Sequence, residues 1–166
     1  MRAAINASPL IFLARLDQLR LLQAYEEVLT TPEVVGKVLM EPLENYPESL
    51  RIKGALEVGF IKVVPAERSL ERDFGLGSGE LSVLVLARQE RLEEVIVDDR
   101  AAIAVAKYLG LRVVSTPFLL LRERLSGRIS IEEFERSLDG LLRANYYISP
   151  RLLEKIRRKA SEARNG

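Results

Sequence analysis

Short apolar segments alternate along the chain with longer amphipathic stretches, and this alternation limits the possible folds more than any other feature. The apolar segments that fit buried strands are residues 3–6, 27–30, 61–64, 94–97 and 112–114. Stretches with helical spacing of apolar residues separate them. Strands alternating with helices predict a parallel sheet with right-handed crossovers and helices on both faces. We therefore expect an α/β fold.

Serine or threonine followed by proline marks three of the expected helix starts. Ser8, Thr31 and Thr116 each precede a proline and are expected to act as caps. The expected helices cover residues 9–16, 19–25, 33–40, 48–57, 81–89, 100–109, 117–126, 131–145 and 150–163. Because no repeat or linker interrupts this order, we expect a single domain over residues 1–166. Its core would span about 3–126, with C-terminal helices at 130–163.

The absence of two residue types limits the kinds of catalytic and metal site that the chain can form. The chain has no cysteine and no histidine, which excludes disulfides, zinc–thiolate sites and histidine acid–base catalysis. A cation held only by oxygen atoms points to Mg²⁺ or Mn²⁺. The net charge of +1 gives no bulk signal for nucleic acid. No apolar run approaches the roughly 18 residues of a membrane span, so we expect a cytoplasmic protein.

Acidic and amide side chains stand where ligands bind in such folds. Asn6 ends the first strand, Asp98 and Asp99 follow the strand at 94–97, and Glu80 lies in the first turn of a helix. Ligands of open parallel sheets bind outside the carboxyl ends of the strands. Grouped carboxylates repel one another unless a cation lies between them. A metal there would activate water and neutralise charge during phosphodiester cleavage.

Each of these residues also fits an ordinary structural role. Glu80 suits the positive end of a helix dipole, the pair Asp98–Asp99 suits an N-cap, and Asn6 suits a turn. Only their order along the chain favours a common site. Gly77 and Gly79 are too few for a phosphate-binding loop, which argues against a nucleotide-binding or small-ligand α/β family.

Several segments resemble PIN-domain proteins of the DUF3368 type. They read NASPLI at 6–11, LGSGELSVLVLA at 76–87, VIVDDRAA at 95–102, LGLRVVST at 109–116 and YYISP at 146–150. The similarity extends over residues 3–157, and the order and spacing of the segments are more specific than any one of them.

The resemblance implies a three-layer α/β/α sandwich with a mostly parallel sheet of about five strands. It implies cleavage of single-stranded RNA with Mg²⁺ or Mn²⁺ by a homodimeric toxin that pairs with an antitoxin protein. Carried over by position, the implied metal ligands are Asn6, Glu80, Asp98 and Asp99. Glu80, Asp98 and Asp99 would be catalytic, with Ser8 and Thr116 close by.

The chain departs from the family pattern at three positions. The first ligand is often Asp, and here it is Asn6. The helix after the second strand often carries an acid, and here it reads VGKV at 35–38. The second acid of the glycine–glutamate motif is replaced by Ser82. Each lost negative charge weakens cation binding, and Lys37 would compete with a metal if it lies near the site.

These departures leave two functions open. The first is a metal-dependent ribonuclease, and the second is a weakened PIN-like module that binds RNA or a protein partner without cleavage. The basic residues that would steer phosphate or simply face water are Arg100, Lys107 and Arg112, together with those of the C-terminal helix. The apolar residues that would form either a partner surface or core are Val34, Val35, Val38 and Leu39.

Overall fold

The computed structural model describes residues 1–67, 69–70 and 72–163, and these fall into two compact units. The first unit is Met1–Ser115 and the second is Thr116–Gly166. That the two form one domain stays a prediction.

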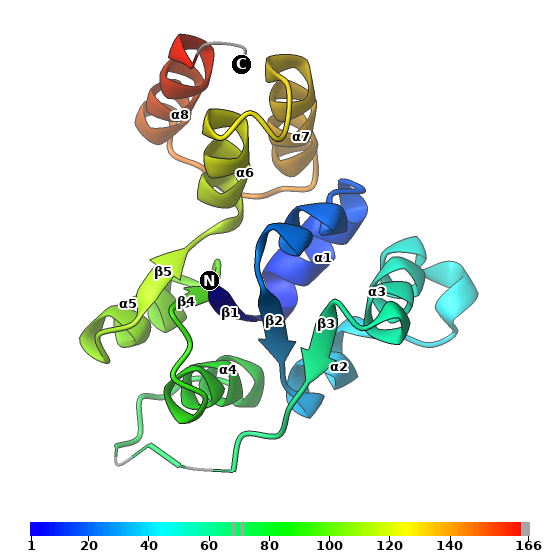
Figure 1. The fold of residues 1–166 in the computed structure, drawn as a ribbon, viewed down its shortest axis with the longest axis vertical. Helices are drawn as coiled ribbons and strands as arrows, with labels where there is room; N and C mark the ends of the chain where they lie inside the picture. The colour runs from blue at the N-terminus through cyan, green and yellow to red at the C-terminus, as the bar shows by residue number, and fades with distance from the viewer. Residues whose placement is uncertain (68, 71, 164–166) are drawn as a thin grey trace. The chain divides into compact units, whose positions relative to one another are not determined.

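A parallel sheet organises the first unit. Across the described ranges it has five strands in the order β3-β2-β1-β4-β5 (Figure 1). The strands are β1 (Arg2–Ile5), β2 (Glu27–Thr30), β3 (Ile61–Val63), β4 (Glu94–Ile96) and β5 (Arg112–Val114). Every neighbouring pair is parallel. The predicted α/β class and parallel sheet are confirmed.

Helices cover the sheet on both faces. They are α1 (Ala7–Arg15), α2 (Pro32–Val38), α3 (Pro47–Val58), α4 (Ser78–Gln89) and α5 (Arg100–Tyr108), with short 3₁₀ helices η1 (Leu19–Ala24) and η2 (Leu43–Asn45). Helix α1 contacts α3, α4 contacts α5, and α2 contacts both α1 and α4. Right-handed crossovers place α1 and α3 on one face and α4 and α5 on the other, which is the expected α/β/α sandwich.

The central strands β1 and β4 form the middle of the core. Ala3, Ala4 and Ile5 of β1 and Val95 and Ile96 of β4 are fully buried. Since both faces of these strands lie under helices, they read as uninterrupted apolar runs. The polar residues that follow these two strands, Asn6 and Asp98, are therefore attached to the best-packed part of the sheet.

The helix starts match the sequence signals in one case and differ in another. Thr31 caps α2, because its Oγ1 accepts a hydrogen bond from the Val34 N–H at 3.3 Å. The prediction that Ser8 caps α1 is wrong. Strand β1 ends at Ile5, and extended Asn6 is already the N-cap of a helix that starts at Ala7. Ser8 is consequently an exposed residue of the first turn.

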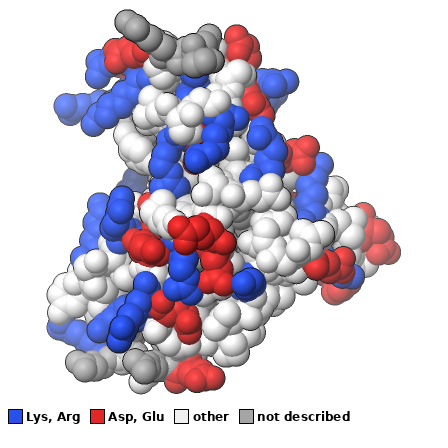
Figure 2. Space-filling model, viewed as in Figure 1, with Lys and Arg blue, Asp and Glu red and all other residues white. Residues whose placement is uncertain are grey.

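Within residues 116–163 the second unit is built of α6 (Thr116–Leu125), α7 (Ile131–Arg143) and α8 (Pro150–Glu162). These three helices contact one another. Arg157 of α8 donates to Glu135 at 3.2 Å and to Asp139 at 2.9 Å on α7. Lys and Arg side chains gather where α8 lies, at the upper left of Figure 2. No helix in the described ranges has the length and apolar character that crossing a membrane requires.

Candidate functional site

The strand order reverses between β1 and β4, and the candidate residues follow these two strands. The edge at which all strands end is called the carboxyl edge below. The Asn6 N–H donates to the Ile96 carbonyl at 3.0 Å, so Asn6 lies beside the end of β4. Asp98 comes two residues after that strand. The structure therefore places Asn6 and Asp98 at the switch point where ligands of open α/β sheets bind.

Asn6 carries an unsatisfied buried atom. The residue is only 2% exposed, and its Oδ1 has no hydrogen-bond partner among the residues that the structure describes. Its backbone groups, in contrast, bond to Ile96 and Leu10. A buried acceptor without a donor costs about 1–3 kcal/mol. Such an atom in a ligand-binding position suits a cation or a hydrogen-bond donor supplied by a ligand.

The two aspartates have different environments. Asp98 is half-buried, whereas Asp99 is exposed. Asp99 is the N-cap of α5, and its Oδ1 accepts a hydrogen bond from the Ala102 N–H at 2.8 Å. Asp99 therefore has the N-cap role that the sequence suggested for one of these two aspartates.

Glu80 is paired with a lysine. It lies in the first turn of α4, and its Oε2 is 3.7 Å from the Nζ of Lys37, in the last turn of α2. The Lys37 side chain is 44% exposed and the Glu80 side chain is 25% exposed, so the pair lies at the surface of the protein. Lys37, which would compete with a metal, thus lies beside Glu80.

Two glycines make room for this pair. A Cβ at Gly79 would lie 2.8 Å from Nζ, 3.2 Å from Cε and 3.3 Å from Cδ of Lys37. A Cβ at Gly77 would lie 2.6 Å from Oε2 of Glu80. The lysine stem therefore lies directly over the backbone of the first turn of α4. In the sequence these glycines indicated only a helix start, and no local pattern connects them to Lys37.

Buried hydroxyl groups join α2 to α4 beside the pair. The Oγ atoms of Thr31 and Ser82 are 2.7 Å apart and share a hydrogen bond. Ser82 also donates to the Gly79 carbonyl at 2.8 Å. Thr30, at the end of β2, donates to the Ile5 carbonyl at 2.8 Å. Ser82, at a position where the family often has an acid, is thus a neutral, 8% exposed link between two helices.

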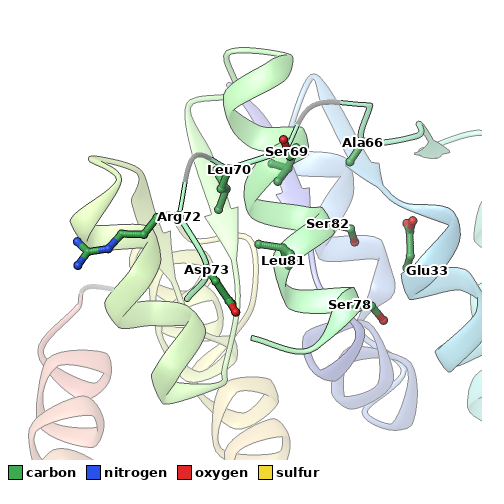
Figure 3. A pocket seen from close by; sticks show the side chains of 10 residues that line it. Glu33, Ala66, Ser69, Leu70, Arg72, Asp73, Ser78, Leu81 and Ser82 are labelled. Atoms are coloured by element: carbon green, nitrogen blue, oxygen red, sulfur yellow. The ribbon is translucent and has the colours of Figure 1, made fainter. Parts of the chain in front are cut away.

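A cavity of about 480 Å³ opens next to Ser82. Figure 3 shows its lining residues on α4, on the segment that precedes α4 and, with Glu33, on α2. The residues that line it are Glu33, Ala66, Ser69, Leu70, Arg72, Asp73, Ser78, Leu81, Ser82 and Val85. Nothing in the sequence pattern indicated this cavity, because its walls come from three separate segments.

The basic candidates lie in different places. Arg100 is the first residue of α5 and lies at the carboxyl edge. Lys107 lies in the last turn of α5, and Arg112 is the first residue of β5. Because α5 runs back against the strands, Lys107 and Arg112 belong to the opposite edge of the sheet, away from Asn6.

The other residues considered for the site or for a partner surface include three that are buried in the fold. Val34 and Val38 are fully buried in the core, so they do not form an exposed apolar patch. Thr116 is the buried first residue of α6 in the second unit.

The metal implied by the resemblance can be compared with these positions. Among the described residues, no three Asp, Glu, His or Cys side chains are grouped so that they could hold a metal ion. Glu80 is engaged by Lys37, Asp99 caps a helix, and Asn6 is neutral. The side chains as placed do not fit a metal centre of three or more carboxylates.

Comparison with known families agrees with the fold. The family model DUF3368, described as a PIN domain, matches residues 2–162. No curated protein matches the chain. The match covers the sheet, the carboxyl edge and the helices of both units.

Proposed function

Because the chain belongs to the PIN-domain family, we propose that it binds single-stranded RNA at the carboxyl edge without cleaving it through a resident metal ion. PIN domains have a nuclease-like fold and generally use divalent metals. The observation that carries the proposal is the grouping of charges at this edge. Glu80 is neutralised by Lys37, and in the described ranges no third acid completes a metal site.

The same edge keeps features suited to RNA. Helices α1, α2, α4 and α5 begin there, and the N–H groups at helix starts attract phosphate. In the part of the chain that the structure describes, the Oδ1 of Asn6 is a buried acceptor without a donor, and a ribose 2′-hydroxyl or base amino group that reaches it would supply one. These features support binding, whereas the neutral ligands and the lysine argue against hydrolysis.

Binding of a fluorescent single-stranded RNA, measured by anisotropy in EDTA, tests the proposal. Asn6→Leu keeps the branched shape of the side chain but removes the acceptor, and it should weaken binding about tenfold. Asn45→Leu, on exposed η2, is the matched control and should bind like wild type. If Asn6→Leu binds normally while Lys155→Glu on α8 loses binding, the RNA site lies on the basic helix and the proposal is wrong.

The second candidate is a metal-dependent ribonuclease, a toxin of a toxin–antitoxin pair. It is favoured by the buried Oδ1 of Asn6, which has no partner among the described residues, and by Asp98, which follows β4 at the switch point. Glu80, Asp98 and Asp99 would then act with Mg²⁺ or Mn²⁺. An antitoxin encoded by the neighbouring gene and a homodimer in sedimentation would support this candidate.

A cleavage assay distinguishes the two candidates. The first predicts that RNA stays intact with Mn²⁺, and that Asp98→Asn binds RNA at least as tightly because one negative charge is removed near phosphate. The second predicts that the wild type cleaves RNA with Mn²⁺ and that Asp98→Asn does not. Cleavage that depends on Asp98 would rule out the first candidate.

A further inference from the structure

We propose that the Lys37 ammonium is a resident cation of the carboxyl edge, which excludes a divalent metal from Glu80 and contacts a phosphate of the bound RNA. The exclusion of metal stands on the geometry alone. The phosphate contact rests on the RNA binding proposed above.

The position of the Lys37 side chain against the backbone of α4 is the first argument. Any side chain at Gly79 would meet the lysine stem, since its Cβ would come within 2.8 Å of Nζ and 3.2 Å of Cε. Nζ lies 3.7 Å from Glu80 Oε2, and Gly77 leaves the space that this carboxylate fills. Fixing a lysine side chain costs rotamer entropy, and its contacts with the backbone of α4 and with Glu80 offset part of that cost. The glycines and the lysine thus form one arrangement.

Electrostatics gives the second argument. A metal that binds Glu80 must approach a carboxylate that already has a positive charge beside it. An ammonium repels a divalent ion at this short distance, and at a side chain that is 44% exposed water screens part of the repulsion. The neutral Asn6 and Ser82 provide no compensating charge.

The free donors of Lys37 give the third argument. An ammonium has three N–H donors, and Glu80 engages one side of it. The Lys37 side chain is 44% exposed, which leaves its other donors accessible from solvent. They lie next to the first turn of α4, where the N–H groups at a helix start have no acceptor within the helix and attract anions. A backbone phosphate fits this combination.

Calorimetric titration with Mn²⁺ tests the exclusion of metal. Wild type should show no binding up to about 1 mM, whereas Lys37→Glu should bind at least about tenfold more tightly. Lys53→Glu is the matched control, because Lys53 forms a similar exposed pair with Glu57 at 3.9 Å on α3. Glu80→Gln should abolish the binding gained by Lys37→Glu. Glu80-dependent Mn²⁺ binding by the wild type, or equal binding by the two Lys→Glu variants, would overturn the proposal.

RNA binding in EDTA tests the phosphate contact. Lys37→Met keeps the stem and should weaken binding about tenfold, with a salt dependence reduced by about one unit of slope. Lys53→Met should bind like wild type. Equal affinities of Lys37→Met and Lys53→Met would refute the contact. If the wild type binds no RNA, the proposed function fails together with the contact, and the Mn²⁺ titration still decides the exclusion of metal.

Discussion

At the scale of single residues, Lys37 balances the charge of Glu80, and Gly79 leaves the space in which the lysine side chain lies. Lys37 lies in α2 and Gly79 in α4, and the lysine stem occupies the space that a side chain at Gly79 would fill. The negative charge of Glu80 is thereby balanced within the protein. Substitution of one glycine should accordingly alter binding without removing any charged group.

Gly79→Ala should displace Lys37 and weaken RNA binding about as much as Lys37→Met. The atoms that its Cβ meets belong to the far end of a flexible chain, so stability should change by less than about 1 kcal/mol. Gly54→Ala is the control, since nothing lies within 4 Å of a Cβ there. Within α3 it should stabilise by about 0.5–1 kcal/mol and leave RNA binding unchanged. Urea unfolding measures the change in stability, and fluorescence anisotropy measures RNA binding. Normal RNA binding by Gly79→Ala would contradict the proposed position of Lys37 over Gly79.

At the scale of elements, opposite charges join three neighbouring strands. Glu27 of β2 accepts hydrogen bonds from Arg2 of β1 and from Lys62 of β3, both at 2.8 Å. These hydrogen bonds, first from Lys62 and then from Arg2, hold the pKa of Glu27 below its ordinary value of 4.5. A carboxyl with a lowered pKa in the folded state contributes stability while it is ionised, and this contribution is lost as pH falls.

Glu27→Gln should therefore destabilise the protein at pH 7, by up to about 1 kcal/mol because the Lys62 side chain is exposed. The difference from wild type should shrink as pH falls below 4.5 through the lowered pKa of the folded state. Urea unfolding at a series of pH values measures it. Glu57→Gln, which removes one exposed pair within α3, should show a smaller difference. A difference for Glu27→Gln that stays constant down to acid pH would contradict the linkage.

At the scale of the whole molecule, the family match extends over both compact units. The second unit has its own apolar centre, with Phe134, Leu138 and Leu141 fully buried. Its helices are therefore held by packing within residues 116–163. In our proposal the ligand of the carboxyl edge binds the first unit. Its effect on the free energy of unfolding therefore reports on the first unit.

Thermal unfolding of the full chain should be the same in EDTA and in millimolar Mn²⁺. A ligand that binds only the folded state, present at 100 times its dissociation constant, adds about 2.7 kcal/mol of stability. Since Lys37 excludes the metal in our proposal, the wild-type midpoint should not rise, whereas that of Lys37→Glu should. Differential scanning calorimetry gives both midpoints. A wild-type midpoint that rises with Mn²⁺ and falls again with EDTA would contradict the proposal.

The sequence alone determined the strands, the helices, the parallel sheet and the family. Strand ends and helix caps depend on neighbouring residues, so Asn6, Asp98 and Glu80 in the first turn of α4 could be assigned to the carboxyl edge from local signals. The cap at Ser8 was missed by two residues because the end of β1 depends on its pairing with β4.

Only the tertiary structure decided which groups meet at that edge. Lys37 and Gly79 are far apart in the chain, and no periodicity relates them. Their contact, the Thr31–Ser82 hydrogen bond and the adjoining cavity follow from the packing of α2 against α4. Packing is set by shape across the whole core, whereas secondary structure is set within a few residues. For this reason the residue types of the site, and Lys37 as a competitor of a metal, could be named from the sequence, whereas the pairing of Lys37 with Glu80 over the backbone of Gly79 could not.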